Sequence, residues 1–196
     1  MKRLLDIVGG LAGCVFFAPI LAIVAVLIKI EDGGPVFFRQ LRIGKGGKPI
    51  YIWKLRSMVL NAEEIKKQLE AENQHAEGVT FKMKRDPRIT KVGRWIRKLS
   101  LDEAPQVWSV LKGDMALVGP RPPVPQEVQK YNSFELRRLT VKPGLTCLWQ
   151  IGGRSDIDFS GQVRLDLQYI YSESIWKDIK ILFLTIPAVL MGRGAY

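Results

Sequence analysis

The stretch IVGGLAGCVFFAPILAIVAVLI, from Ile7 to Ile28, contains no charged side chain. As an unbroken helix it would rise about 1.5 Å per residue and reach across the roughly 30 Å hydrocarbon layer of a bilayer. Pro19 lies near its middle, where proline removes a main-chain donor and bends a helix. The sequence therefore predicts a bent, membrane-associated helix within residues 1–30.

Charges at both ends of this segment favour the same side of the membrane. Lys2 and Arg3 precede it, and Lys29 follows it. Six more cations come next with no acidic residue among them: Arg39, Arg42, Lys45, Lys48, Lys54 and Arg56. Because Lys and Arg close to a membrane segment favour the cytoplasmic side, we expect a re-entrant helix that enters one leaflet and returns. A straight crossing stays open, since proline also occurs in spanning helices.

A third interpretation is a lipoprotein signal, because Leu11-Ala12-Gly13-Cys14 resembles a lipid-attachment cleavage site. The residues before Cys14 include the charged Asp6, and those after it are more apolar. A signal peptide is apolar before its cleavage point and not after it, so we favour a helix that is retained.

The chain of 196 residues has an ordinary globular composition, with 47% hydrophobic and 25% charged residues. Its 30 Lys and Arg exceed its 19 Asp and Glu, which gives a net charge of +11 and predicts an acidic partner. That partner is nucleic acid, anionic lipid or a phosphorylated small molecule. Two Cys and one His, His75, exclude a disulfide framework, a zinc cage and a His-rich metal site.

Residues 31–196 are expected to form one cytoplasmic domain of the α+β class, mainly helical. Short apolar runs at 36–38 and 50–53 flank a Gly-rich segment and predict a small β-hairpin. Helices are expected at 61–77, 101–112, 125–139 and 159–171. The apolar segment 175–191 carries charges near its start and Pro187, which is typical of an interfacial amphipathic helix rather than a second crossing.

Asp102 and Glu103, within the segment SLDEAP, are the candidate catalytic residues. One interpretation is structural: Ser100 and Glu103 form a capping box, and Asp102 suits the positive end of a helix. The other is a division of labour, in which one carboxylate is a nucleophile and its neighbour binds a metal or orients a group. The nearby cations are Arg94, Arg97 and Lys98. They should keep such a carboxylate ionised and lower its pKa.

Two later segments are candidates for phosphate binding. In GPRPP, residues 119–123, the prolines stiffen the backbone so that Arg121 can project its planar guanidinium at a phosphate; a polyproline connector is the alternative. In KPGLT, residues 142–146, and GGR, residues 152–154, the glycines allow either close backbone approach to a ligand or simple turns. The sequence contains no Walker-type or dinucleotide-binding fingerprint.

Two non-enzymatic functions also stay open. The basic run Phe81–Lys98, which includes Trp95, favours a membrane-tethered module that binds nucleic acid. A lipid-binding scaffold, in which Asp102 and Glu103 only cap a helix, is the second.

Taken in order, these segments resemble the bacterial sugar transferase family, the monotopic polyprenol-phosphate phosphoglycosyl transferases. The matching segments are GPVFFRQ (34–40), WKLRSM (53–58), SLDEAPQ (100–106), GDMALVGPRP (113–122), KPGLT (142–146) and WQIGGR (149–154). The closing GRGAY, residues 192–196, is similar to the end of members that transfer hexose 1-phosphates. The resemblance covers nearly the whole chain.

The resemblance implies a monotopic enzyme on the cytoplasmic face of the bacterial inner membrane. Such an enzyme moves a sugar 1-phosphate from a UDP-sugar to polyprenol phosphate, such as undecaprenyl phosphate, releases UMP and initiates polysaccharide assembly. By the same resemblance, Asp102 is the nucleophile that forms an aspartyl phosphosugar, Glu103 is its partner, and both hold Mg²⁺. Arg97, Arg121 and Arg154 match positions that contact phosphate or nucleotide.

The implied partners are the UDP-sugar, the polyprenol phosphate and membrane lipid, with no nucleic acid. The sugar stays open between glucose and galactose. A homodimer is one possible oligomeric state, and the chain is either complete or the catalytic part of a longer protein.

Overall fold

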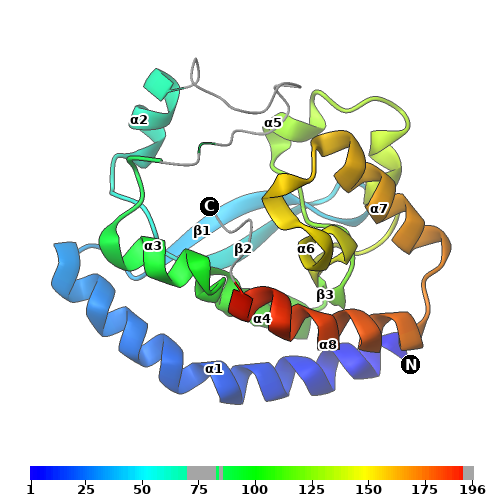
Figure 1. Ribbon diagram of the computed structural model, residues 1–196, viewed down its shortest axis with the longest axis horizontal. Helices are drawn as coiled ribbons and strands as arrows, with labels where there is room; N and C mark the ends of the chain where they lie inside the picture. Colours follow the sequence, from blue (N-terminus) through cyan, green and yellow to red (C-terminus); the bar gives the residue numbers. More distant parts are fainter. Residues whose placement is uncertain (70–82, 84–85, 192–196) are drawn as a thin grey trace.

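The computed structural model of the chain describes residues 1–69, 83 and 86–191 (Figure 1). Its elements are α1 (Lys2–Asp32), β1 (Phe37–Ile43), η1 (Lys45–Gly47), β2 (Pro49–Leu55), α2 (Ala62–Leu69), α3 (Lys91–Lys98), η3 (Leu101–Gln106), α4 (Val107–Lys112), β3 (Ala116–Val118), α5 (Pro125–Val128), η4 (Glu135–Thr140), β4 (Gly144–Thr146), α6 (Leu148–Gly152), η5 (Arg154–Asp156), α7 (Phe159–Tyr171) and α8 (Ile175–Met191), where η marks a 3₁₀ helix. Helices dominate and the described strands pair in small sheets, so the mainly helical α+β class is confirmed. The division at residue 30 stays a prediction.

Helix α1 runs without interruption through Pro19 and ends at Gly33, which adopts the left-handed conformation with φ 70°. The helix is bent near its middle (Figure 1). Among the described residues it is the helix long and apolar enough to cross a membrane. Much of its surface is exposed and apolar, and one stripe at helical spacing contains Leu4, Val8, Leu11, Val15, Val26 and Ile30. The long apolar helix is thus confirmed, while its re-entrant path stays a prediction.

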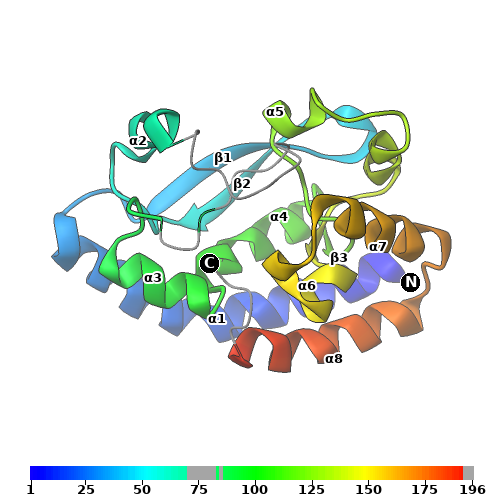
Figure 2. The same cartoon turned by 45° about the horizontal axis from the view of Figure 1, so that its top comes forward.

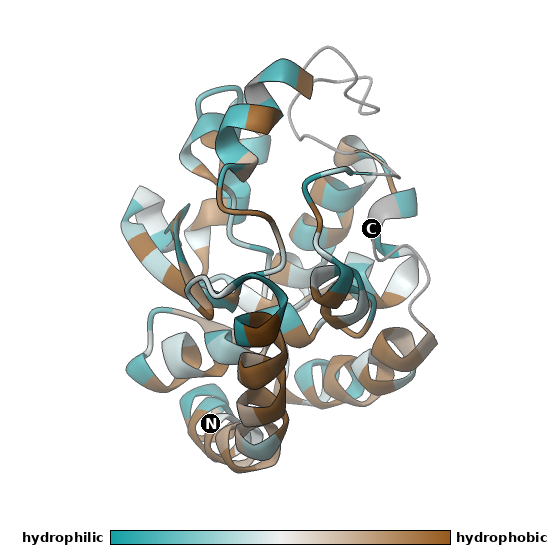
Figure 3. Cartoon of the chain, turned by 90° about the vertical axis from the view of Figure 1, so that its left-hand side faces the viewer, coloured by the Kyte–Doolittle hydropathy of each residue, from teal (hydrophilic) through white to brown (hydrophobic). Residues whose placement is uncertain are grey.

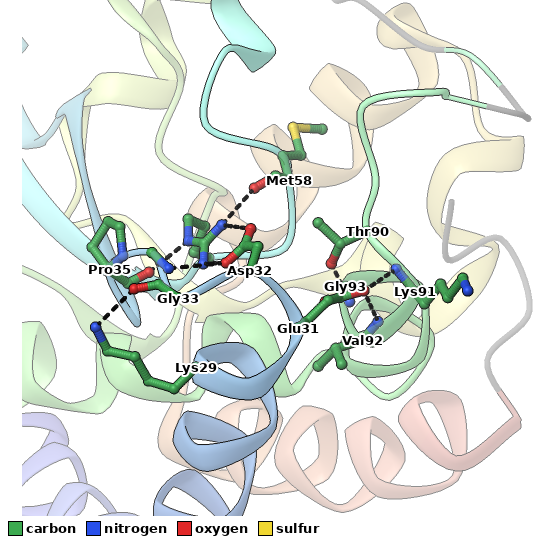
Figure 4. Close-up of polar contacts among 12 residues, drawn as sticks. Lys29, Glu31, Asp32, Gly33, Pro35, Met58, Thr90, Lys91, Val92 and Gly93 are labelled. Atoms are coloured by element: carbon green, nitrogen blue, oxygen red, sulfur yellow. Dashed lines mark hydrogen bonds and ion pairs between the residues drawn. The ribbon is translucent and has the colours of Figure 1, made fainter.

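Both ends of α1 bind the same polar domain. Near the start, Arg3 donates from Nη1 and Nη2 to the carbonyl oxygens of Val110 and Leu111, at 2.6 Å each. At the other end, Glu31 Oε1 accepts from the first amides of α3, and Asp32 forms an ion pair with Arg56 (Figure 4). Charged and polar contacts therefore fix the two ends of the apolar helix to one body.

Strands β1 and β2 form the predicted hairpin, with Arg39 opposite Trp53 and Leu41 opposite Tyr51. Successive side chains of a strand point to opposite faces. The face toward the domain carries Arg42, Ile52 and Lys54, which are buried or partly buried. The outer face leaves large apolar side chains exposed: Phe37, Leu41, Tyr51 and Trp53. The hairpin thus delivers two cations inward and presents an apolar surface outward.

Strands β3 and β4 pair in parallel, an arrangement that the sequence analysis does not predict. Their contact depends on two glycines. A Cβ atom on Gly144 would lie 2.0 Å from the main-chain nitrogen of Gly119, so the backbones could not approach with any other residue there. Gly119 and Gly144 thus allow close contact between two chain segments, and Gly144 also lines the cleft that contains Glu103. The contact fixes the start of the Pro-rich segment that carries Arg121.

The expected helices are found with two corrections. Segments 159–171 and 175–191 are α7 and α8 with the same bounds. The helix expected over 101–112 is divided into η3 and α4, because Pro105 cannot donate to the regular ladder. The helix expected over 125–139 is also wrong, since only the short α5 and η4 form. Of the helix expected over 61–77, the part from Ala62 to Leu69 is observed as α2, and residues 70–77, with His75, lie outside the described residues.

Helices α1 and α8 lie along one face of the molecule (Figures 1 and 2), and the end of the hairpin that carries Phe37 and Trp53 lies beside α1. In Figure 3 the ribbons of these two helices are largely coloured as apolar. Exposed apolar side chains of α8 include Trp176, Phe183, Ile186 and Leu190. Asp178 is buried and holds the start of α8 to the domain. The amphipathic helix is confirmed, and its place at a membrane surface stays a prediction.

Candidate active site

The short helix η3 carries both candidate carboxylates. Before it, Ser100 has φ 53°, in the left-handed region that non-glycine residues seldom adopt. Its side chain makes no capping hydrogen bond, so the capping-box interpretation is wrong. The Glu103 carboxylate turns to cations on other segments instead. Residues held in this conformation cost about 1–3 kcal/mol and cluster at functional sites.

Glu103 lies among three cations that the fold brings together. Its Oε1 accepts a hydrogen bond from Lys54 Nζ at 2.9 Å and another from Arg121 Nη1 at 2.8 Å. Arg42 lines the same small cleft and donates to the carbonyl oxygen of Pro122 at 2.8 Å. Three cations around one carboxylate leave a positive excess, which favours a phosphate group.

The two carboxylates have opposed electrostatics. Burial and the adjacent Glu103 charge raise the pKa of Asp102 above its ordinary value. Burial opposes ionisation of Glu103 as well, but Arg121 and Lys54 outweigh it and hold the pKa of Glu103 far below its usual range. The lowered pKa expected from sequence is therefore wrong for Asp102, where desolvation exceeds the attraction of the cations. A pair with divergent pKa values is typical of two different catalytic roles.

The three arginines selected from sequence lie at different distances from Asp102 and Glu103, hereafter the dyad. Arg121 binds Glu103 directly. Arg97, in the last turn of α3, acts on Asp102 electrostatically and lowers its pKa. Arg154 has a left-handed backbone with φ 52°, burial lowers its pKa, and the Glu103 charge opposes that shift. All three act on the dyad, and their contacts with a substrate stay predictions.

Lys54 and Arg42 are two cations of the cleft that were not among the site residues expected from the sequence. Burial lowers the pKa of Lys54, and burial together with Arg121 lowers that of Arg42 to about 10. The signal was present in the strand PIYIWKL, where Lys54 shares a face with Ile50 and Ile52. A lysine on the inward face of a hairpin needs a buried counter-charge, and Glu103 supplies it.

The dyad could supply the carboxylate ligands of a magnesium site. Among the described residues there is no group of three or more His, Cys, Asp or Glu side chains that could hold a metal ion. Mg²⁺ is usually held by one or two carboxylates together with water and substrate phosphates, so Asp102 and Glu103 are compatible with it. Glu103 Oε1 already accepts hydrogen bonds from two cations. The oxygens of the dyad that could bind the metal ion are therefore Glu103 Oε2 and those of the Asp102 carboxylate.

An apolar pocket of about 380 Å³ lies beside η3. Its walls come from α1, the hairpin and the η3–α4 junction and include Phe17, Leu21, Phe37, Trp53, Pro105 and Trp108. Pro105 belongs to the same short helix as the dyad. The apolar pocket and the cationic cleft therefore share η3 as a common wall.

These features define a class of protein: a polar domain seated on one long apolar helix, with a cationic, carboxylate-bearing cleft beside an apolar pocket. The chain matches the family described as bacterial sugar transferase over residues 1–192. It belongs to the bacterial sugar transferase family, which confirms the resemblance seen in the sequence.

Individual relatives match the chain over its full length. It is 53% identical over 195 residues to the "Galactosyl transferase CpsE" of Streptococcus agalactiae, covering 99% of this chain and 43% of that protein. It is 44% identical over 199 residues to the "Undecaprenyl-phosphate galactose phosphotransferase" of Salmonella typhimurium, covering 100% of this chain and 42% of that protein. It is 39% identical over 198 residues to the "Exopolysaccharide production protein ExoY" of Rhizobium meliloti, covering 100% of this chain and 88% of that protein. The chain thus spans less than half of the first two relatives and most of the third.

The charge balance predicts different effects for the two neutralised carboxylates. Glu103→Gln leaves Lys54, Arg121 and Arg42 without their buried counter-charge and should lower the free energy of unfolding by about 3 kcal/mol. Asp102→Asn removes a charge that burial disfavours, so it should leave stability unchanged or raise it. Chemical denaturation of both variants and the wild type in one detergent at pH 7 measures this.

The pH dependence gives a second readout with a defined sign. Because folding raises the pKa of Asp102, the folded state binds that proton more tightly than the unfolded state. This group therefore makes the wild type less stable as pH rises from about 4 through the raised pKa. Asp102→Asn should lose that decrease. A greater loss of stability from Asp102→Asn than from Glu103→Gln at pH 7 would contradict the proposed charge balance.

Proposed function

We propose that this chain transfers a sugar 1-phosphate from a UDP-sugar to polyprenol phosphate and releases UMP. The observation that carries the proposal is the dyad, whose carboxylates have divergent pKa values in a cleft of positive excess beside an apolar pocket. The name of the Salmonella relative supports undecaprenyl phosphate as the acceptor and a galactose phosphate as the group transferred. The names of the Streptococcus and Rhizobium relatives favour a hexose donor and a role in polysaccharide synthesis.

In the first half-reaction, an oxygen of Asp102 attacks the sugar-linked phosphorus of the donor. The Asp102 oxygen–phosphorus bond forms, the bond from that phosphorus to the UMP oxygen breaks, and UMP leaves with the electron pair. A raised pKa makes the ionised Asp102 carboxylate a stronger nucleophile than an exposed aspartate. Arg97, Arg121 and Arg154 neutralise the donor phosphates, and Glu103 holds Arg121 in place.

In the second half-reaction, an oxygen of the polyprenol phosphate attacks the same phosphorus. The bond to Asp102 breaks, the carboxylate is regenerated, and the product is a polyprenyl diphosphate sugar. This covalent intermediate separates the encounter with a soluble donor from the encounter with an acceptor confined to the membrane. Mg²⁺, held by the dyad and the donor phosphates, would supply further charge neutralisation.

The apolar pocket is suited to the isoprenoid chain of the acceptor. It is bordered by α1, so a lipid chain reaches it from the membrane side, and Pro105 brings it next to the dyad. Its volume of about 380 Å³ accommodates the first isoprene units and leaves the rest of the chain among lipids.

We also propose the monotopic arrangement, in which α1 dips into the cytoplasmic leaflet and returns. It is supported by the polar contacts that bind both ends of α1 to one domain, through Arg3 at one end and Glu31 and Asp32 at the other. A straight crossing would carry one end and its charged partners to the far side of the bilayer. The exposed apolar face of α8 and the net charge of +11 favour an anionic membrane surface.

Asp102→Asn should abolish UMP release from UDP-galactose or UDP-glucose with undecaprenyl phosphate, because an amide oxygen is a poor nucleophile toward phosphorus. UMP formed by purified protein in nanodiscs measures this. The matched control is Asp114→Asn, which removes a carboxylate on the surface and should leave turnover unchanged. Retained turnover in Asp102→Asn would exclude Asp102 as the nucleophile.

Trp53→Ala and Trp108→Ala should raise the KM for undecaprenyl phosphate about 10-fold, because each removes a large part of the apolar pocket wall. The KM for the UDP-sugar should not change. Trp95→Ala is the control, since Trp95 is an exposed tryptophan on α3 that does not line the pocket. An equal rise in both KM values would place the acceptor chain elsewhere.

The re-entrant path is tested by labelling single cysteines with a membrane-impermeant maleimide. One variant has a cysteine added ahead of Met1 and the other has Lys48→Cys in the hairpin loop, both with Cys14 and Cys147 replaced by alanine. Both sites should react in inside-out vesicles and neither in intact spheroplasts. Reaction of the two sites from opposite sides would establish a straight crossing.

A further inference from the structure

Two charged side chains in the first turns of α1 bind the main chain of β3. Asp6 is 4% exposed although it belongs to the apolar helix, and its Oδ1 accepts a hydrogen bond from the amide of Leu117 at 2.8 Å. Lys2 Nζ donates to the carbonyl oxygen of Val118 at 3.1 Å. Burial of an ionisable side chain is costly unless it has hydrogen-bond partners, and the main chain of β3 provides them here. The mechanism above uses neither residue.

Lys2 is itself held by a partly buried polar network. Its Nζ also donates to Tyr169 Oη at 2.6 Å and to Asp178 Oδ2 at 2.7 Å, and it lies 3.0 Å from Glu173 Oε1. The Tyr169 hydroxyl donates to Asp178 Oδ1 at 2.6 Å. These contacts join α1, β3, α7 and α8 around one ammonium group. The several partners of this ammonium group restrain its position, so Lys2 offers Val118 a fixed donor.

Strand β3 leads directly to Arg121. The next residue after the strand, Gly119, donates its amide to the carbonyl oxygen of Thr146 at 3.0 Å, which fixes β3 to β4. Asp6 and Lys2 hold main-chain groups of the same strand from α1. Three residues beyond Val118, Arg121 meets Glu103 at 2.8 Å. The path of the chain into the cleft is therefore set by β4 and α1 together.

We infer that Lys2 and Asp6 are positioning residues, which fix β3 through its main chain so that Arg121 meets Glu103 at the donor phosphate. This inference rests on the proposed function. Phosphoryl transfer depends on positioning and charge neutralisation, and small displacements of a phosphate ligand reduce binding and rate. The same contacts attach α1 to the domain, so the position of the apolar helix and the geometry of the cleft are coupled.

The test is a double-mutant cycle on donor binding in an Asp102→Asn background, in which bound donor is not consumed. Asp6→Ala removes the acceptor for the Leu117 amide and should weaken binding of UDP-galactose, with UDP-glucose measured beside it, by about 10-fold, the scale of one lost charged hydrogen bond. With Arg121→Ala also present, adding Asp6→Ala should change the Kd by less than about 2-fold, because the two residues act through one contact. Isothermal titration calorimetry in nanodiscs measures each Kd.

Two further variants separate positioning from simple loss of structure. Asp6→Asn keeps an oxygen that accepts from the Leu117 amide and should restore donor binding. Leu4→Ala, in the same turn of α1 but 66% exposed, should bind donor like the parent. If Asp6→Ala fails to fold, Lys2→Met takes its place in the cycle, with the same non-additivity expected.

Failure of the inference is distinguishable from failure of the proposed function. If the Asp102→Asn parent binds neither UDP-galactose nor UDP-glucose, the proposed hexose donor is wrong and the inference fails with it. If the parent binds donor and Asp6→Ala binds equally well, only the inference is overturned. An equal loss from Asp6→Ala with and without Arg121 would likewise overturn it, because Asp6 would then act independently of the arginine.

Discussion

The contact between the apolar helix α1 and the polar domain is the constraint on which the rest of the structure depends. Three glycines on the inner side of the helix allow this contact, because Cβ atoms on Gly9, Gly10 and Gly13 would lie 2.5, 2.8 and 3.3 Å from side chains of β3 and α4. Small residues permit such close packing in an apolar environment, where no hydrophobic driving force joins two surfaces. Ion pairs and amide contacts then secure the ends of the helix. One face of α1 thereby packs against the domain, and the other presents exposed apolar side chains.

The packing of α1 against the domain places a cluster of charged side chains close to an apolar surface. The cations that surround Glu103 come from the inward face of the hairpin and from the segment after β3. Removal of water strengthens each charge interaction there, and a charge left without a counter-charge is costly. The cluster around Glu103 keeps a positive excess, which a doubly charged phosphate group would neutralise.

The parts of the fold that depend on local pattern were predictable from sequence, and those that depend on distant contacts were not. The helices expected at 159–171 and 175–191 are α7 and α8 at their observed bounds, and two apolar runs around a glycine-rich loop predicted the hairpin. The parallel β3–β4 pair joins segments far apart in sequence, and each strand has only three residues, too few to show a period. The dyad was found from a motif. Its opposed pKa shifts required knowledge of burial, and the role of Lys54 required knowledge of which strand face turns inward.

The 3₁₀ geometry of η3 explains how adjacent carboxylates come to differ. With three residues per turn, side chains at positions i and i+3 lie in line. Glu103 is therefore in line with Gln106, and both line the cationic cleft. Asp102 is in line with Pro105, which lines the apolar pocket. The desolvation that raises the pKa of Asp102 and the cations that lower that of Glu103 thus belong to two sides of one short helix. In a regular α-helix, whose side chains advance by about 100° per residue, positions i and i+3 would lie about 60° apart and this alignment would be lost.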